Sequence, residues 1–230
     1  MVKAQVLMVY PIEFYKIFWP QIGPILVKSY NYAFNSGQLS ASQRRGVITL
    51  IPKDGKDEEL LKHWRPISLL NVDYKIVAKV IANRLKGVLN SVICNDQTGF
   101  LSNRYIGENV RLVLDIIEYA DANNVPGTLF FIDFEKAYDK LEWNYVQKCL
   151  KYFGFGDDLR KWVQLFYTQV SSCITNNGHI SNDFDLSRGV RQGCPLSCYI
   201  FILCSELIAI SLRCNNSVKG IGIDNQSEVK

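Results

Sequence analysis

The sequence predicts an α+β fold, because segments with helical and strand patterns mix without strict alternation. Apolar residues recur every three or four positions over residues 73–93 and 108–122, which is typical of amphipathic helices. Short runs rich in β-branched and aromatic residues, at 46–53 and 128–132, are typical of strands. The 230 residues suffice for one or two domains with a hydrophobic core.

The N-terminal part of the chain is expected to begin with helical segments. Aromatic and aliphatic side chains follow a helical spacing over residues 14–34, and Pro20 and Pro24 should kink or break this helix. The strand at 46–53 leads into a charged loop, and the helix at 73–93 has one apolar side. This side is formed by Ile76, Val77, Val80, Ile81, Leu85, Val88 and Leu89.

The C-terminal part is expected to combine helices with a hairpin. Asn177 and Gly178 are the residue types that favour a tight hairpin turn. Residues 194–214 form a long apolar run that predicts a helix. The other predicted elements are helices within 141–156 and 157–168 and a short strand within 218–224.

Composition excludes several classes of protein. Hydrophobic residues make up 48% and charged residues 21%, which excludes a disordered or collagen-like chain. The net charge of +4 is compatible with a nucleic-acid partner without requiring one. The seven cysteines are scattered and are expected to be reduced. We find no apolar run of about 20 residues and no convincing signal peptide, so we expect an intracellular protein of nucleus or cytoplasm, not secreted and without a membrane partner.

One aspartate stands at the end of a predicted strand. The stretch "TLFFIDFEKAYDK", residues 128–140, delivers Asp133 after an apolar run. A carboxylate in such a position is costly unless it is hydrogen-bonded, paired or bound to a cation. The alternative is a solvent-facing residue or the cap of a following helix.

Two further stretches carry residues suited to phosphate chemistry. The stretch "RGVRQGCPLS", residues 188–197, places two arginines and a glutamine beside two glycines. Glycines let the backbone approach a ligand, and arginines can meet phosphate. Around the strand at 46–53, Lys53, Arg65 and Lys75 form a second basic group. Turn glycines, solvated charges and a capped helix would explain each stretch taken singly.

In order, these stretches resemble the reverse transcriptase of LINE-type (non-LTR) retrotransposons. The resemblance is carried by Lys53, "WRPISLLNVDYKIVAKVIANRL", "DQTGFLSNRYIGENV", "FIDFEKAYDKLEW" and "RGVRQGCPLS", and it covers residues 11–230. It implies a right-hand polymerase with a fingers-like region at 10–127 and a partial palm at 128–230, without a thumb. Residues 1–9 are expected to be a leader foreign to the family, compatible with a misread start.

The resemblance also implies a chemistry. RNA is copied into DNA, with an RNA template, a DNA primer and dNTPs as partners and two Mg²⁺ ions at the reacting phosphate. Asp133 corresponds to the first metal-binding aspartate, and the carbonyl of Phe134 reaches a metal. The aromatic ring of Tyr138 would exclude a ribose 2′ hydroxyl. The implied nucleotide-binding residues are Lys53, Arg65, Phe134, Tyr138, Gln192 and Gly193.

The resemblance further implies an incomplete enzyme. The family's Tyr/Phe-Ala-Asp-Asp motif is expected just beyond Lys230, and the endonuclease and thumb of the longer polyprotein are not part of this sequence. We therefore expect the chain to be inactive alone. Gly156-Asp157-Asp158 is no substitute, because it precedes the Gln-Gly motif and should form a turn and a helix start.

Two other functions remain open. The chain could be a non-catalytic RNA-binding module, or a group II intron maturase-type protein. In the RNA-binding alternative, basic side chains would contact phosphate only. These side chains are Arg44, Arg45, Lys53, Arg65, Arg188 and Arg191.

Overall fold

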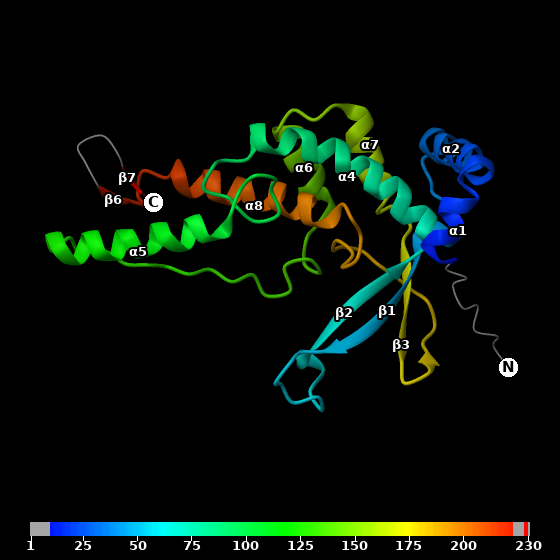
Figure 1. Ribbon diagram of the computed structural model, residues 1–230, viewed down its shortest axis with the longest axis horizontal. Coiled ribbons are helices and arrows are strands. Elements are labelled where there is room, and N and C mark those ends of the chain that lie inside the picture. Colours follow the sequence, from blue (N-terminus) through cyan, green and yellow to red (C-terminus); the bar gives the residue numbers. More distant parts are fainter. Residues whose placement is uncertain (1–9, 223–227, 230) are drawn as a thin grey trace.

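The computed structural model describes residues 10–222 and 228–229. Most helices gather in one layer, and a small sheet projects from it (Figure 1). The helices are α1 (Ile12–Ile17), α2 (Trp19–Ser36), α3 (Ala41–Arg44), α4 (Val72–Val92), α5 (Ile106–Asn123), α6 (Trp143–Tyr152), α7 (Asp157–Leu165) and α8 (Ser197–Arg213), with the short 3₁₀ helix η1 (Leu61–His63). The strands are β1 (Arg45–Pro52), β2 (Trp64–Leu70), β3 (Ser171–Asn176), β4 (His179–Ile180), β5 (Phe184–Asp185), β6 (Ile221–Gly222) and β7 (Glu228–Val229). This mixture of helices and sheet agrees with the predicted α+β class.

The N-terminal helical segment breaks once. The break lies at Phe18, between α1 and α2. Pro20 occupies the first turn of α2, where an amide N–H has no helical partner to lose. Pro24 lies inside α2, and the helix continues through it. The predicted break is therefore confirmed near Pro20, whereas Pro24 does not break the helix.

The main sheet has the strand order β2-β1-β3-β4, and β5 also pairs with β3. β1 runs antiparallel to β2 and parallel to β3. β3 and β4 form the predicted hairpin, in which Asn177 and Gly178 have φ of 48° and 77°. These left-handed values are those that a tight two-residue turn requires. β2 ends the strand order, so one of its edges has no neighbouring strand among the described residues.

The hydrophobic core lies between the helices. On α4, Val77, Ile81, Leu85 and Leu89 recur every four residues and are buried. This confirms most of the predicted apolar side, although Val80 and Val88 remain exposed. α8 packs against α4 and α6, and Figure 1 shows α4 and α8 running side by side.

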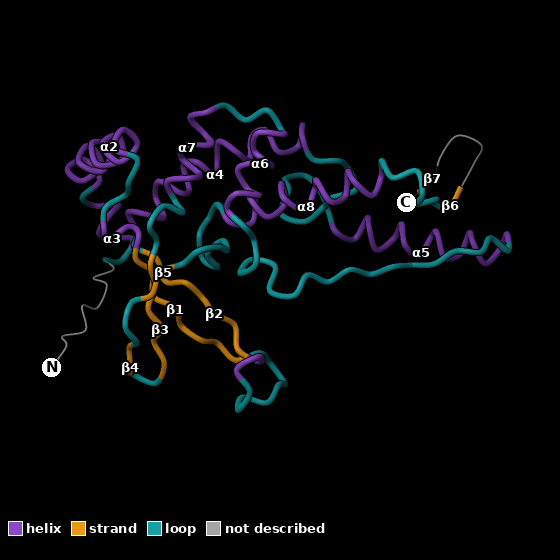
Figure 2. The backbone as a smooth tube through the Cα atoms, turned by 180° about the vertical axis from the view of Figure 1, so that it is seen from behind, coloured by secondary structure: helices purple, strands orange, loops and turns teal. Residues whose placement is uncertain are grey.

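The segment predicted as a buried strand does not form one. Residues 125–134 belong to a long loop that follows α5 and runs back beside it (Figure 2). Phe130 and Phe131 are 82% and 79% exposed. The prediction was wrong because an apolar run becomes a strand only when a neighbouring strand satisfies its backbone groups, and none of the described strands pairs with it.

The Gly156-Asp157-Asp158 stretch lies at the start of α7. Gly156 precedes α7 as its N-cap residue, and Asp157 and Asp158 lie in the first helical turn. The prediction that Gly156-Asp157-Asp158 is a turn and helix start is therefore confirmed.

Over the described residues, no helix has the length and apolar character needed to cross a bilayer.

Candidate functional site

A short connector, residues 188–193, links the segment around Tyr138 to the sheet. On one side, the N–H of Gly189 donates to the carbonyl of Leu141 at 2.7 Å, and the N–H of Val190 donates to the carbonyl of Tyr138 at 2.8 Å. The sequence motif around Asp133 and the glycine-rich motif are thus joined by main-chain hydrogen bonds. The connector holds the position of the turn that contains Tyr138.

On its other side, the connector meets the free edge of β2. The N–H of Ser68 donates to the carbonyl of Gln192 at 2.8 Å. Gly193 follows with φ of 112°, and a Cβ atom there would lie 2.6 Å from the carbonyl oxygen of Ser68. Only glycine fits this backbone conformation and this close approach. Gln192 and Gly193, which the sequence predicts to be nucleotide-binding, are therefore held at the edge of β2.

Tyr138 and Phe134 meet on helix α8. Their ring centroids lie 5.5 Å and 5.9 Å from the ring centroid of Phe201. Tyr138 is half-buried, and burial raises the pKa of its phenol, with a smaller contribution from Cys198. These ring contacts support the turn that follows Asp133.

Asp133 itself lies on the exposed loop that precedes this turn. Within the described residues it makes no hydrogen bond or ion pair. Its carboxylate and the neighbouring carbonyl of Phe134 are oxygen donors of the kind that Mg²⁺ prefers. Among residues 10–222 and 228–229, no cluster of three or more His, Cys, Asp or Glu side chains could hold a metal ion.

Lys53 and Arg65 lie toward the tip of the β1–β2 hairpin. Arg65 stands opposite Ile51, and the N–H of Lys53 continues the ladder by donating to the carbonyl of His63 at 2.8 Å. Because alternate residues of a strand share a face, Lys53 and Arg65 lie on the same face of the hairpin. Arg65 is exposed, whereas the amino group of Lys53 donates to the carbonyl of Lys62 at 3.1 Å.

The structure thus joins only some of the predicted site residues. Tyr138, Gln192 and Gly193 are linked through the connector, and Phe134 reaches the same part of α8 as Tyr138. No hydrogen bond or ion pair within the described part of the chain connects Asp133 to Lys53 or Arg65.

A pocket of about 300 Å³ lies between the β1–β2 hairpin and the connector. Its polar lining includes Ser68, Asp139, Asp185, Arg188 and Gln192. Burial raises the pKa of the Asp139 carboxyl, and nearby Lys136 partly opposes this. Asp139 lies within the "FIDFEKAYDKLEW" stretch but is not among the nucleotide-binding residues that the family resemblance implies.

Arg191 does not face solvent as the RNA-binding alternative expected. Its side chain is 4% exposed, and Nη2 donates to the carbonyl of Arg44. Its guanidinium is therefore not presented at the protein surface, where the RNA-binding alternative needs it. The alternation of charged and glycine residues gave no signal of this burial.

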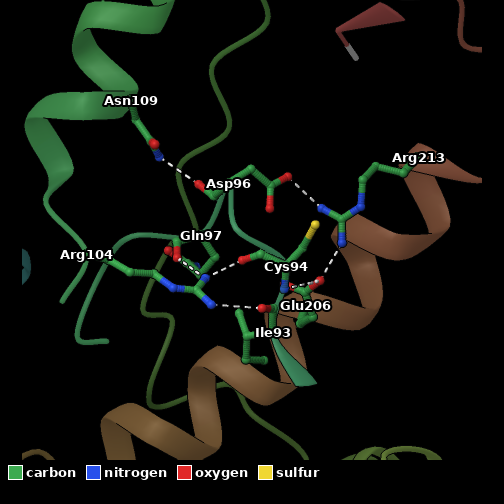
Figure 3. Close-up of polar contacts among 8 residues, drawn as sticks. All are labelled: Ile93, Cys94, Asp96, Gln97, Arg104, Asn109, Glu206 and Arg213. Carbon is green, nitrogen blue, oxygen red and sulfur yellow. Dashed lines mark hydrogen bonds and ion pairs between the residues drawn. The ribbon is translucent and has the colours of Figure 1, made fainter. Parts of the chain in front are cut away.

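Sequence reasoning also missed a polar network at the end of α4 (Figure 3). Arg104 donates to several main-chain carbonyls there, including that of Ile93 at 3.0 Å and that of Gln97 at 2.8 Å. A cation at this end of a helix satisfies its unpaired carbonyl groups and its dipole. In the sequence, the only sign of this network was Arg104, an arginine that directly precedes the helical pattern of α5.

The same network is anchored on α8. Arg213 forms ion pairs with Asp96 at 2.7 Å and with Glu206, and Glu206 is only 3% exposed (Figure 3). The N–H of Cys94 donates to the same Glu206 carboxylate at 3.4 Å. The loop after α4 is therefore fastened to α8, the helix that also carries Phe201.

Comparison with known families gives one match over most of the chain. The model of the family described as reverse transcriptase (RNA-dependent DNA polymerase) matches residues 51–219. This range contains every predicted site residue.

Three relatives are proteins of transposable elements. An uncharacterized 149 kDa protein of transposon TX1 from Xenopus laevis is 38% identical over 202 residues, which are 88% of this chain and 15% of that protein. The Pol polyprotein of the type-2 element R2DM from Drosophila melanogaster is 27% identical over 82% of this chain and 18% of its own length. A probable RNA-directed DNA polymerase from transposon BS of Drosophila melanogaster is 26% identical over 76% of this chain and 19% of its own length. The chain spans less than a fifth of each relative.

Among solved structures, apo telomerase from Candida tropicalis, truncated from its C-terminal domain, is similar with a TM-score of 0.46 and 15% sequence identity. The similarity covers 78% of this chain and 42% of that chain.

Proposed function

The chain belongs to the reverse transcriptase (RNA-dependent DNA polymerase) family, and from this premise we propose that it forms the nucleotide-binding part of an enzyme that copies RNA into DNA. The observation that carries the proposal is the connector. It joins Tyr138, Gln192 and Gly193 to β2, the strand that also bears Arg65. Residues from three separate sequence motifs are thereby held on or against one strand.

The triphosphate of the incoming nucleotide would bind at the β1–β2 hairpin. Lys53 and Arg65 share one face of this hairpin, and arginine can donate two parallel hydrogen bonds to phosphate. The exposed guanidinium of Arg65 is free to turn toward a ligand. Lys53 would exchange its bond to a main-chain carbonyl for a phosphate contact.

The sugar and base would lie against Tyr138, Gln192 and Gly193. Glycine at position 193 lets the backbone of this turn lie close against Ser68 in β2, which would hold Gln192 and Gly193 in place beside the nucleotide. The ring of Tyr138, supported by Phe201, would block a 2′ hydroxyl and so select deoxynucleotides. Such selection needs a rigid ring, and the contact with α8 supplies that rigidity.

Asp133 and the carbonyl of Phe134 would hold Mg²⁺, since carboxylate and carbonyl oxygens are suitable ligands for this hard cation. In a complete family site, two Mg²⁺ ions would supply activation of a primer hydroxyl and neutralisation of the leaving pyrophosphate, and Asp133 and the Phe134 carbonyl would provide part of their ligands. The chain's own contribution is to place Asp133 directly before the turn that Phe134 and Tyr138 anchor on α8.

The proposed partners are an RNA template, a DNA primer and dNTPs, within a longer polyprotein of a non-LTR element. This is supported by the relatives, of which the chain spans less than a fifth. We propose a fingers-like role for residues 10–127 and a partial palm role for 128–230.

Titration of the purified chain with a dNTP in the presence of Mg²⁺ tests the proposal. Asp133→Ala and Arg65→Ala should each weaken binding at least about fivefold, the loss of one charge-assisted contact. Asp121→Ala and Arg111→Ala, which make the same changes on exposed positions of α5, are the matched controls and should bind normally.

Two outcomes would contradict the proposal. The wild-type chain could fail to bind dNTPs, or the site and control variants could bind equally. The RNA-binding alternative would be established if the chain bound RNA in a salt-sensitive way, bound no dNTP, and kept the same RNA affinity after Asp133→Ala.

A further inference from the structure

Arg191 is a cation placed inside the protein rather than on its surface. Its side chain is 4% exposed, and its guanidinium carbon lies 5.5 Å from the centre of the Tyr74 ring on α4. Nη2 donates to the carbonyl of Arg44, the residue before β1. One side chain thus contacts both a helix and the start of a strand.

This arrangement is unfavourable for stability alone. Arg191 has no ion-pair partner among the described residues, and its Nε and Nη1 donors have no hydrogen-bond partner there. A buried charge and unsatisfied donors both lower stability, and an apolar side chain of similar size would avoid this cost. The contribution of Arg191 to the stability of the fold therefore does not explain why an arginine occupies this position.

The main chain of Arg191 is held as firmly as its side chain. Its carbonyl accepts a hydrogen bond from the hydroxyl of buried Ser197 at 2.9 Å and another from the N–H of Cys194 at 3.1 Å. The next two residues are Gln192 and Gly193, which lie against β2. Arg191 thus contacts α4, the residue before β1 and the start of α8, directly beside Gln192 and Gly193 of the proposed nucleotide site.

We infer that Arg191 is a positioning residue for nucleotide binding: its buried guanidinium sets the place of the Gln192–Gly193 turn at the edge of β2. The inference rests on the proposed function. A planar guanidinium can lie over the Tyr74 ring while one of its N–H groups donates to the Arg44 carbonyl, a geometry that the compact ammonium of lysine does not reproduce. Because Gly193 leaves no room for a Cβ atom against Ser68, a small shift of the turn changes the pocket.

The test is a double-mutant cycle read out as the Kd for a dNTP with Mg²⁺. Arg191→Lys keeps the charge and loses the planar contact, so its Kd should rise about tenfold. If Arg191 acts through Gln192, the same substitution in a Gln192→Ala background should change Kd less than about twofold. If Arg191 had a merely structural role, the effects of Arg191→Lys and Gln192→Ala on Kd would be independent and would add.

Arg45→Lys is the matched control. It makes the same substitution at the start of β1, where the guanidinium pairs with Asp183 at 2.8 Å on the surface. Its Kd should equal that of the wild type, and thermal unfolding checks that every variant is folded. If Arg191→Lys does not fold, Ser197→Ala replaces it, since it removes the bond to the Arg191 carbonyl and should also raise Kd.

Each outcome is decisive. A folded Arg191→Lys or Ser197→Ala variant with wild-type Kd, or effects that simply add in the cycle, overturns the inference and leaves the proposed function standing. If the wild-type chain binds no dNTP, both the proposed function and the inference about Arg191 are contradicted.

Discussion

The N–H of Ser68 in β2 donates to the carbonyl of Gln192 at 2.8 Å, so a residue of the glycine-rich motif extends the open edge of the sheet. The bond is reinforced by Gly193, whose backbone passes closer to Ser68 than any side chain would allow. Two motifs that lie far apart in the sequence are thereby held in one fixed relationship.

Gly193→Ala should lower the free energy of unfolding by at least about 3 kcal/mol. The new Cβ atom would both strain a residue with φ of 112° and meet the Ser68 carbonyl at 2.6 Å. Gly178→Ala is the control, because φ is also positive there but the space around a Cβ is open. It should cost roughly 1–2 kcal/mol. Equal losses in urea denaturation would show that the close approach is unimportant.

Replacing Tyr138 by Ala should reduce the preference for deoxynucleotides. Without the ring, a ribose 2′ hydroxyl has space, so the Kd for an rNTP should approach that for the matching dNTP. Phe134→Ala removes the other ring that packs on Phe201 and keeps the Phe134 carbonyl, so it should leave the Kd ratio unchanged. An unchanged ratio for Tyr138→Ala would remove the proposed role of this ring.

The two carboxylates that pair with Arg213 should contribute unequally to stability. Glu206 is 3% exposed and also accepts a hydrogen bond from the N–H of Cys94, so Glu206→Gln removes a buried charged acceptor and should cost about 2 kcal/mol. The Asp96 side chain is 54% exposed, and Asp96→Asn should cost less than about 1 kcal/mol. Urea denaturation of both variants measures the difference, and a larger loss for Asp96→Asn would contradict the prediction.

Stability should depend on pH through Asp139. Burial raises the pKa of this carboxyl in the folded state, so the folded protein favours its protonated form. The stabilising contribution is complete below the unfolded pKa of about 3.8 and is lost as the pH rises through the folded pKa. Asp139→Asn should therefore become more favourable, relative to the wild type, between pH 3.5 and pH 7.

Denaturation of both proteins across this pH range provides the measurement. Asp185→Asn removes a carboxylate from the same pocket and separates the effect of position 139 from that of a lost negative charge. Parallel stability curves for wild type and Asp139→Asn would rule out the effect.

The exposed apolar loop should promote self-association. Phe131→Lys replaces a side chain that is 79% exposed, so light scattering should decrease while the free energy of unfolding stays within about 0.5 kcal/mol. Phe130→Lys should act similarly, since Phe130 is 82% exposed. A large loss of stability in either variant would show that the ring is packed in solution.

Helices were predicted well because their signal is local. The four-residue spacing of Val77, Ile81 and Leu85 needs only one neighbouring surface to become the buried side of α4. The Asn177–Gly178 turn was also predictable, because two residues alone carry its conformational requirement. The family was evident from the order of its motifs, and the family match over residues 51–219 confirms it.

The strand expected at 128–132 does not form, and Arg191, a phosphate contact in the RNA-binding alternative, is buried; both differences have one common reason. A strand requires a partner, and burial depends on what the rest of the chain places around a side chain; neither is encoded in the segment itself. The sequence was thus sufficient for the helices, the turn and the family. Tertiary packing placed Gly193 against Ser68 and Arg191 between Tyr74 and Arg44, because those contacts join residues far apart along the chain.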